Sequence, residues 1–401
     1  MIEASEEIDF IMRGGHHPDP EMDSVEQFVV NTAYNRVRTQ PAWEELGYRT
    51  AYNLSHLYHF YMSSDPRILK LLYRLEPFPP YVEMEVTQGV CPLKCKMCEL
   101  TYWDEKNIQV PFNKFKGVMD QFPELKWAGN NALGDPFTNP DYGRMVKYLD
   151  DKHVCQEVYT AGTLLKEKEM KRYAQMNSFI YFKFSLDAAT KETFEKIRVG
   201  ADFDHVISII KALDGAKRDY NKFYPAMHFH YIIMKDNVHE CSDYLDMLNS
   251  LDVRVGGVTF SRMLHYFKEA DDCFMEVPKS LCDKLVTKGR KLGINVNFNA
   301  DLPEAKRPAS ECNVLSMPYI FPDGTVISCC CMNEQNRRDW QRETSMGNVF
   351  ETPMRDIWYG EKYTHLRKML WEKKVEQAHP VCSICNIYDK TKESCLIRQQ
   401  F

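Results

Sequence analysis

Hydrophobic and polar residues alternate in two different periods between about residue 81 and residue 304. Short β-rich runs predict seven strands, and the amphipathic stretches between them predict helices. Such βαβ units favour a parallel sheet, either open and doubly wound or closed into a barrel. The expected strands are Val82–Gln88, Leu125–Asn130, Glu157–Thr160, Phe179–Leu186, Met227–Met234, Val255–Phe260 and Ile294–Phe298. The expected helices include Asp141–Asp151, Lys166–Met176, Lys191–Lys211 and Val238–Leu251.

The regions on either side of this pattern differ from it. Residues 1–80 show helical patterns and end at Pro77-Phe78-Pro79-Pro80, which cannot continue a helix. Near the other end, Tyr319–Ser328 predicts two short strands joined by a Pro-Asp-Gly turn. We therefore expect a helical extension at 1–80, a strand–helix domain at 81–304 and a small cysteine-rich α+β domain at 305–401.

Composition narrows the class of protein. The 401 residues are 44% hydrophobic and 27% charged, as in globular chains, and the formal charge of −6 argues against a nucleic-acid partner. The first residues do not form a signal peptide, and no apolar run is long enough to span a membrane. We expect a cytoplasmic protein with reduced thiols, so its fourteen cysteines are candidates for metal binding rather than disulfides.

Three of these cysteines follow the first predicted strand within eight residues: Cys91, Cys95 and Cys98. A tetrahedral zinc site needs a fourth ligand, and the next fifty residues contain neither histidine nor cysteine. Three thiolates on a four-iron cluster would instead leave one iron free to bind another group. The spacing therefore favours an iron–sulfur cluster.

A second group of cysteines is spread over the last ninety residues. Cys312 is followed by Cys329-Cys330-Cys331 and then by the CxxC pair Cys382 and Cys385. Four such thiols suit either zinc or an iron–sulfur cluster, and the residues alone leave both open.

The first motif resembles the CxxxCxxC signature of radical S-adenosylmethionine (SAM) enzymes. The resemblance implies a partial (β/α)6 TIM-like barrel in which Cys91, Cys95 and Cys98 hold a 4Fe–4S cluster whose fourth iron is chelated by SAM. Met97 stands where the family often has an aromatic residue, and it is expected to pack near the adenine.

Other segments resemble the family's cofactor-binding motifs. Gly134-Asp135-Pro136 is similar to its GEP motif, and Thr160-Ala161-Gly162 to its Thr-Asn-Gly turn. Ser185-Leu186-Asp187 with Arg198 resembles its strand-four signature, and Asn237 is expected to cap the next helix. The resemblance implies SAM-binding roles for Met97, Gly134, Asp135, Thr160, Ser185, Asp187 and Arg198.

The C-terminal region resembles the SPASM extension of these enzymes in its shorter "twitch" form. This implies one auxiliary 4Fe–4S cluster held by Cys312, Cys329, Cys382 and Cys385. Cys329, Cys330 and Cys331 are adjacent, so the motif does not fix which of them is the ligand. Cys330 or Cys331 is therefore an alternative to Cys329. The unpatterned cysteines are expected to be buried bystanders: Cys155, Cys241, Cys273 and Cys282.

The resemblance implies that a low-potential donor, such as flavodoxin or ferredoxin, drives reductive cleavage of SAM. The resulting 5′-deoxyadenosyl radical takes a hydrogen atom from the substrate. The auxiliary cluster would assist a net oxidation or a rearrangement, so the chain is expected to be an oxidoreductase-type enzyme.

Polar residues on the predicted strands favour a polar cavity. Glu83, Glu85 and Thr87 share one face, as do Lys183 with Ser185 and His228 with His230. We predict a small polar substrate, such as a sugar, an aminosugar or a nucleoside-like molecule. The candidate catalytic residues are His230, Lys183 and Arg262.

A peptide-modifying maturase is the alternative, and residues 1–80 lack the β pattern of a leader-binding winged helix. A non-catalytic zinc or iron–sulfur regulator is a remote third hypothesis. The extension is expected to cover the open end of the barrel or to mediate dimerisation, which leaves a homo-oligomer open.

Overall fold

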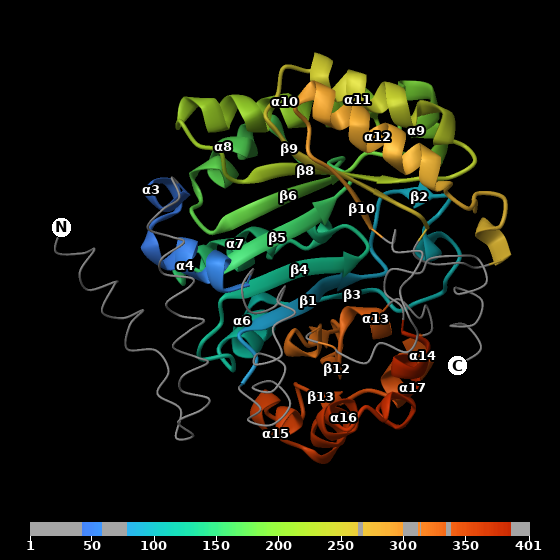
Figure 1. Ribbon diagram of the computed structural model, residues 1–401. Helices are drawn as coiled ribbons and strands as arrows, with labels where there is room; N and C mark the ends of the chain where they lie inside the picture. The colour runs from blue at the N-terminus through green and yellow to red at the C-terminus, as the bar shows by residue number, and fades with distance from the viewer. Residues whose placement is uncertain are drawn as a thin grey trace.

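The computed structural model describes residues 42–57, 78–263, 268–299, 312, 314–333 and 338–385. A curved sheet of eleven strands forms its centre, and helices cover the outer side of the sheet (Figure 1). Seven parallel strands lie in the order β1-β4-β5-β6-β8-β9-β10. Their bounds are β1 Tyr81–Gln88, β4 Trp127–Leu133, β5 Cys155–Thr160, β6 Phe179–Ser185, β8 Ala226–Ile232, β9 Val255–Ser261 and β10 Val296–Asn299.

All seven predicted strands are therefore present, and the predicted partial barrel with its smaller C-terminal region is confirmed. The outer helices are α6 Phe112–Met119, α7 Tyr142–Asp151, α8 Glu167–Gln175, α9 Lys191–Ile197, α10 Phe203–Asp219, α11 Cys241–Ser250 and α12 Lys279–Leu292. In α10 the buried Val206, Ile209, Ile210 and Leu213 recur at helical spacing and face the sheet. The side chain of Asp202 caps this helix by accepting a hydrogen bond from the backbone N–H of His205 at 3.1 Å.

The predicted single helix Lys191–Lys211 is wrong. Strand β7, Arg198–Val199, separates α9 from α10 and pairs antiparallel with β2, Lys94–Cys95. The chain turns there because Gly200 has a φ of 96°, a left-handed conformation that glycine adopts without strain. This interruption places Arg198 beside Cys95.

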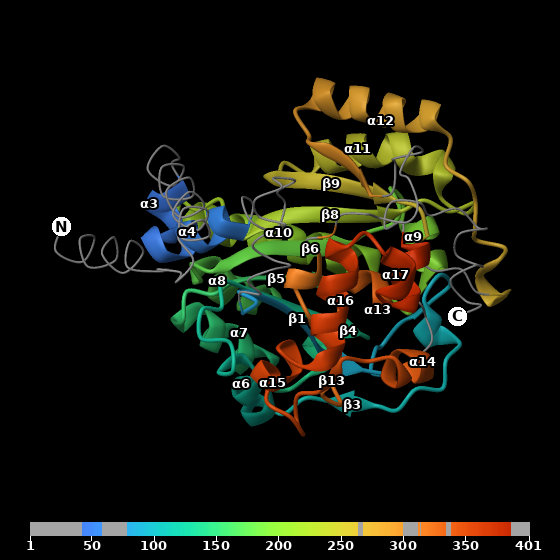
Figure 2. The ribbon, with the colours of Figure 1, turned by 60° about the horizontal axis from the view of Figure 1, so that its bottom comes forward.

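The C-terminal region continues the same sheet. The predicted hairpin is confirmed as β11 Tyr319–Ile320 and β12 Thr325–Ile327, and β13 Gly347–Asn348 follows. Strand β11 lies parallel to β1, with Tyr319 opposite Glu83. The helices of this region, in orange and red, come toward the viewer in Figure 2, and α13 and α14 contact β12. They are α13 Cys330–Asn333, α14 Arg338–Glu343, α15 Met354–Trp358, α16 Glu361–Trp371 and α17 Pro380–Ile384.

Part of the expected N-terminal extension is described as two helices, α3 Ala42–Leu46 and α4 Tyr48–His56. Helix α4 contacts the start of the barrel, where the side chain of Asn53 donates to the carbonyl of His153 at 2.9 Å. Residues 1–41 and 58–77 of the extension, and Cys395, lie outside the described residues. Within the described ranges, no helix has both the length and the apolar character needed to cross a bilayer.

Candidate active site

A cavity of about 540 Å³ lies inside the barrel, between the CxxxCxxC motif and the C-terminal region. This volume falls in the range of small-molecule and cofactor sites. Its lining includes Cys91, Cys95 and Cys98 from the motif, and Tyr319 and Arg338 from the C-terminal region. The barrel strands between them contribute mainly polar side chains. A single cavity therefore connects the two cysteine-containing regions.

The CxxxCxxC loop is held by β2 and by an apolar layer. Its cysteines pack with Leu93, Met97 and Ile197, and Thr101 Oγ1 donates to the carbonyl of Cys95 at 2.8 Å. Burial raises the pKa of Cys91 to about 11 and also raises the pKa of Cys95. The free thiols are therefore protonated at neutral pH, and bound iron would stabilise the thiolates.

The three thiols suit a cluster better than a single ion. All three line the cavity. Among the residues that the structure describes, no three metal-ligating side chains form a site for one ion. Each thiolate on a four-iron cluster binds a different iron, so the sulfur atoms do not need to meet at one point. The loop fits a 4Fe–4S cluster that is exposed to the cavity.

Gly134, Asp135 and Thr160 come together where β4 and β5 end. Asp135 Oδ2 accepts a hydrogen bond from Thr160 Oγ1 at 2.8 Å, and Asp135 Oδ1 accepts one from the N–H of Phe137 at 2.9 Å. A Cβ on Gly134 would lie 2.4 Å from the carbonyl oxygen of Val90, so only glycine fits. All three predicted residues line the cavity, and Met97 lies there as well.

Ser185 and Arg198 also line the cavity, whereas Asp187 lies behind it, fully buried. Arg198 Nε donates to Asp187 Oδ2 at 2.6 Å, and Arg198 Nη1 lies 3.7 Å from Cys95 Sγ. Asp187 Oδ1 accepts from the N–H of Ile232 at 2.7 Å. Asp187 thus orients the guanidinium of Arg198 toward the cysteine loop.

Asn237 does not cap the next helix, contrary to expectation. Its side chain instead donates to the carbonyl oxygens of Asp187 and Ile232, at 2.9 and 2.8 Å, and accepts from the N–H of Met234. It is fully buried and connects the ends of β6 and β8. The fixed backbone around Asp187 depends on this amide.

The described residues that line the cavity do not include the three predicted catalytic residues, His230, Lys183 and Arg262. His230 Nε2 lies 2.9 Å from Ser261 Oγ, and burial lowers its pKa to about 4. Burial also lowers the pKa of Lys183, but its ion pair with Glu157 at 2.7 Å outweighs this effect and raises the pKa overall. Arg262 donates to the carbonyl of Val277 at 2.9 Å. Their catalytic roles stay predictions.

The C-terminal thiols form one group, which we call the auxiliary cysteine group: Cys312, Cys329, Cys331, Cys382 and Cys385. Cys329 and Cys331 are buried, and the other three are half-buried. The four predicted ligands are thus brought together, and Cys331 joins them through a hydrogen bond with Cys385. Cys330 lines the cavity instead. Burial and the neighbouring thiols raise the pKa of Cys382 to about 12, so these cysteines too would ionise on binding iron.

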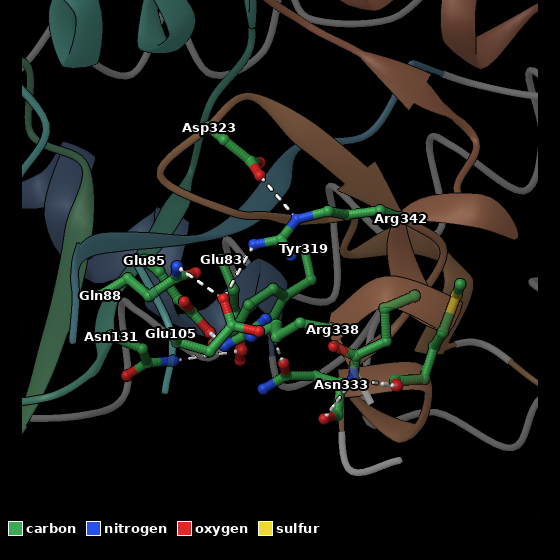
Figure 3. Close-up of polar contacts among 12 residues, drawn as sticks. Glu83, Glu85, Gln88, Glu105, Asn131, Tyr319, Asp323, Asn333, Arg338 and Arg342 are labelled. Carbon is green, nitrogen blue, oxygen red and sulfur yellow. Dashed lines mark hydrogen bonds and ion pairs between the residues drawn. The ribbon is translucent and has the colours of Figure 1, made fainter. Parts of the chain in front are cut away.

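A polar network that the sequence did not indicate connects the C-terminal region to β1 (Figure 3). Arg338 Nη2 donates to Glu85 Oε1 at 2.6 Å, and the hydroxyl of Tyr319 donates to the same oxygen at 2.9 Å. Arg342 lies between Asp323, at 2.9 Å, and Glu105, at 3.3 Å. Glu85 and Arg338 are 253 positions apart, so no local pattern signals the pair.

The C-terminal cysteines fall within a recognised domain. The model of the SPASM iron–sulfur cluster-binding domain matches residues 312–386. This range contains the whole auxiliary cysteine group.

Curated relatives align over most of the chain. A protein of Pyrococcus furiosus described as a tungsten-containing aldehyde ferredoxin oxidoreductase cofactor-modifying protein is 23% identical over 325 residues, 77% of this chain and 88% of the relative. Mycofactocin maturase MftC of Mycobacterium tuberculosis is 21% identical over 352 residues, 84% of each chain.

Solved structures share the fold. SuiB of Streptococcus suis bound to S-adenosylmethionine superposes with a TM-score of 0.58 at 15% identity, covering 75% of this chain and 72% of SuiB. SuiB bound to its precursor peptide SuiA gives a TM-score of 0.56 at 14% identity, covering 73% and 68%.

The barrel, the CxxxCxxC loop and these matches define the chain as a radical SAM enzyme. Within that superfamily it belongs to the enzymes that carry a SPASM-type iron–sulfur domain. Its cofactors are a 4Fe–4S cluster, S-adenosylmethionine and the iron–sulfur centre of the C-terminal domain.

Proposed function

We propose that the chain is a peptide-modifying radical SAM enzyme. The observation that carries this proposal is the cavity, which extends from the CxxxCxxC loop to the SPASM region on the fold shared with peptide-bound SuiB. The relative MftC is named a maturase, which adds support for the peptide-modifying function. The comparisons thus favour the peptide alternative over the small sugar-like substrate that the sequence suggested first.

In this proposal Cys91, Cys95 and Cys98 hold the cluster that binds SAM. Bound there, SAM and the cluster would supply radical chemistry that takes a hydrogen atom from the substrate. Arg198, held by Asp187, directs its guanidinium toward the cysteine loop. Gly134 lets the end of β4 pack against the carbonyl of Val90, just before the cysteine loop, and the apolar layer around Met97 limits the access of water to the loop.

Four members of the auxiliary cysteine group would hold one auxiliary 4Fe–4S cluster. Cys312, Cys329, Cys382 and Cys385 are the predicted set, and the position of Cys331 makes it the alternative to Cys329. We propose that Cys330, which lines the cavity instead, lies outside the set.

The test is anaerobic reconstitution followed by reduction in the presence of SAM. We expect about eight iron atoms per chain and formation of 5′-deoxyadenosine. Candidate peptides encoded next to the gene are then added, and their masses are measured. A peptide that loses hydrogen or gains a cross-link supports the proposal. Turnover of aminosugars with no change in any peptide would overturn the assigned substrate class.

A further inference from the structure

Tyr159 lines the cavity but has no role in the site described above. It lies on β5 between Val158, which packs in the hydrophobic core, and Thr160. Successive side chains of a strand point to opposite faces, so Tyr159 shares the inner face of the barrel with Glu157, which also lines the cavity. The side chain of Tyr159 is 36% exposed, and this exposure is to the cavity.

The hydroxyl of Tyr159 is held by Lys183, which lies opposite it on β6. Lys183 Nζ donates to the hydroxyl oxygen at 3.0 Å and forms an ion pair with Glu157 at 2.7 Å. Burial lowers the pKa of Lys183, but the ion pair raises it overall, so the side chain stays an ammonium group. An ammonium group has only hydrogens to offer. The hydroxyl oxygen of Tyr159 is therefore the acceptor in this contact.

The hydroxyl hydrogen of Tyr159 is left for another acceptor. Burial inside the barrel raises the pKa of Tyr159 and outweighs the effect of the Lys183 charge, so the hydroxyl is neutral at pH 7. Within the described part of the chain, Lys183 is its one hydrogen-bond partner. The nearby ring of His230 is edge-on to the phenol at 6.1 Å, and its Nε2 pairs with Ser261. The hydrogen is thus available to a molecule in the cavity.

The position of Tyr159 along β5 places this donor beside the predicted SAM-binding residues. The next residue is Thr160, whose hydroxyl donates to Asp135 at 2.8 Å, and consecutive Cα atoms are about 3.8 Å apart. A group that Tyr159 holds would therefore lie next to the part of the cavity where the proposed chemistry takes place.

We propose that the hydroxyl of Tyr159 donates a hydrogen bond to a carbonyl oxygen of the substrate, and that Lys183 is a positioning residue that orients this hydroxyl. Because the phenol oxygen already accepts from Lys183, the group offers a hydrogen, which suits an oxygen that only accepts. Holding the carbonyl also fixes the C–H bonds beside it. If the proposed peptide function is correct, the carbonyl belongs to the peptide, and the inference rests on that function for this point. The amide of an acetylated aminosugar is the other source of the same chemistry.

The probes are N-acetylalanine N-methylamide and N-acetylglucosamine. Each is titrated into reconstituted enzyme saturated with SAM, and binding is measured by nuclear magnetic resonance of the probe. We expect Tyr159→Phe, which keeps the ring, to bind the responding probe about three- to tenfold more weakly than the natural protein does. The loss should be smaller for the dithioamide of the first probe, because sulfur is a weaker acceptor. Equal affinities of the two proteins for both probes, or binding of neither probe, overturn the proposal.

A second replacement and a matched control test the hydroxyl itself. Incorporation of 3-fluorotyrosine at position 159 makes the phenol a stronger donor and should tighten binding. Tyr220→Phe is the control, because Tyr220 is 40% exposed, its hydroxyl also accepts from a side chain, Gln175 Nε2 at 2.9 Å, and it lies outside the cavity lining. Probe binding should not change in this variant. The iron content verifies that each protein has folded. Unchanged affinity in both proteins altered at position 159 overturns the proposal.

The positioning role of Lys183 is tested separately. Lys183→Met releases the hydroxyl and should weaken probe binding, but less than Tyr159→Phe does. In the Tyr159→Phe background it should have no further effect, because Lys183 acts through that hydroxyl. An equal loss with and without the hydroxyl overturns the positioning role.

The two probes also separate the two sources of the carbonyl. A Tyr159-dependent affinity for N-acetylalanine N-methylamide supports the donor and the peptide function together. Such an affinity for N-acetylglucosamine alone supports the donor but contradicts the peptide function. A peptide that the natural protein and Tyr159→Phe modify at the same rate overturns the donor and leaves the peptide function intact.

Discussion

The two cysteine regions of this enzyme are built in opposite ways. Cys91, Cys95 and Cys98 come from eight consecutive residues after β1, and a short strand pairing holds their loop. The auxiliary cysteine group draws its members from segments up to 73 positions apart, between Cys312 and Cys385. The first region is encoded locally, while the second exists only once the C-terminal region has folded against β1.

This difference matters because the SPASM region depends on long-range contacts. Strand β11 pairs with β1, and the buried Arg338–Glu85 ion pair joins the two regions beside the auxiliary cysteine group. Perturbing β1 is therefore expected to affect the C-terminal iron, whereas perturbing the C-terminal region should leave the CxxxCxxC loop able to cleave SAM.

The largest effect is expected from Cys95→Ala. The variant removes one of three ligands of the SAM-binding cluster and should reduce 5′-deoxyadenosine formation to background, because the auxiliary iron cannot replace that cluster. The amount of 5′-deoxyadenosine is measured by chromatography after the enzyme has been reduced in the presence of SAM. Cys155→Ala is the control, since this thiol is buried at the base of the barrel beside the carbonyl of Thr50. Cleavage that survives in Cys95→Ala would contradict the assignment of the loop.

Cys382→Ala should have the next largest effect. Loss of the auxiliary cluster should lower the iron content by about half, while SAM cleavage continues in part. The matched variant is Cys330→Ala, which removes a thiol that faces the cavity and should keep all the iron. Iron analysis and electron paramagnetic resonance of the reduced proteins compare them. A loss of iron in Cys330→Ala but not in Cys382→Ala would reverse the ligand assignment.

Arg338→Met tests the connection between the two regions. It leaves the Glu85 carboxylate, which is 1% exposed, buried without its counter-charge, and this should lower the free energy of unfolding by about 3–5 kcal/mol. Urea unfolding followed by circular dichroism measures the change. The double variant Arg338→Met with Glu85→Leu removes both charges and should recover most of the loss. If it does not, the destabilisation comes from packing and not from the unpaired carboxylate.

The contrast between local and long-range structure also explains which features the sequence predicted. The seven strands and the CxxxCxxC loop follow from local patterns: apolar β-rich runs, and thiols spaced over eight residues. The helix break at Arg198 was missed, because Gly200 alone does not show where α9 ends, and the pairing of β7 with β2 involves residues more than one hundred positions earlier. Arg338 was not singled out, and Cys331 was named only as an alternative to Cys329, for the same reason. Nothing near them in the chain indicates that one meets Cys385 and the other Glu85.

Arg342→Met should have the smallest effect and sharpens the contrast with Arg338. Arg342 also crosses between the regions, since it joins Asp323 to Glu105, but its side chain is 31% exposed. Water screens both ion pairs and solvates the carboxylates that remain, so we expect a loss of about 0.5–1 kcal/mol in the same urea experiment. Added salt should reduce this difference but have little effect on that of Arg338→Met. Equal losses in the two variants would mean that burial of the Glu85–Arg338 pair does not determine how the SPASM region is attached to the barrel.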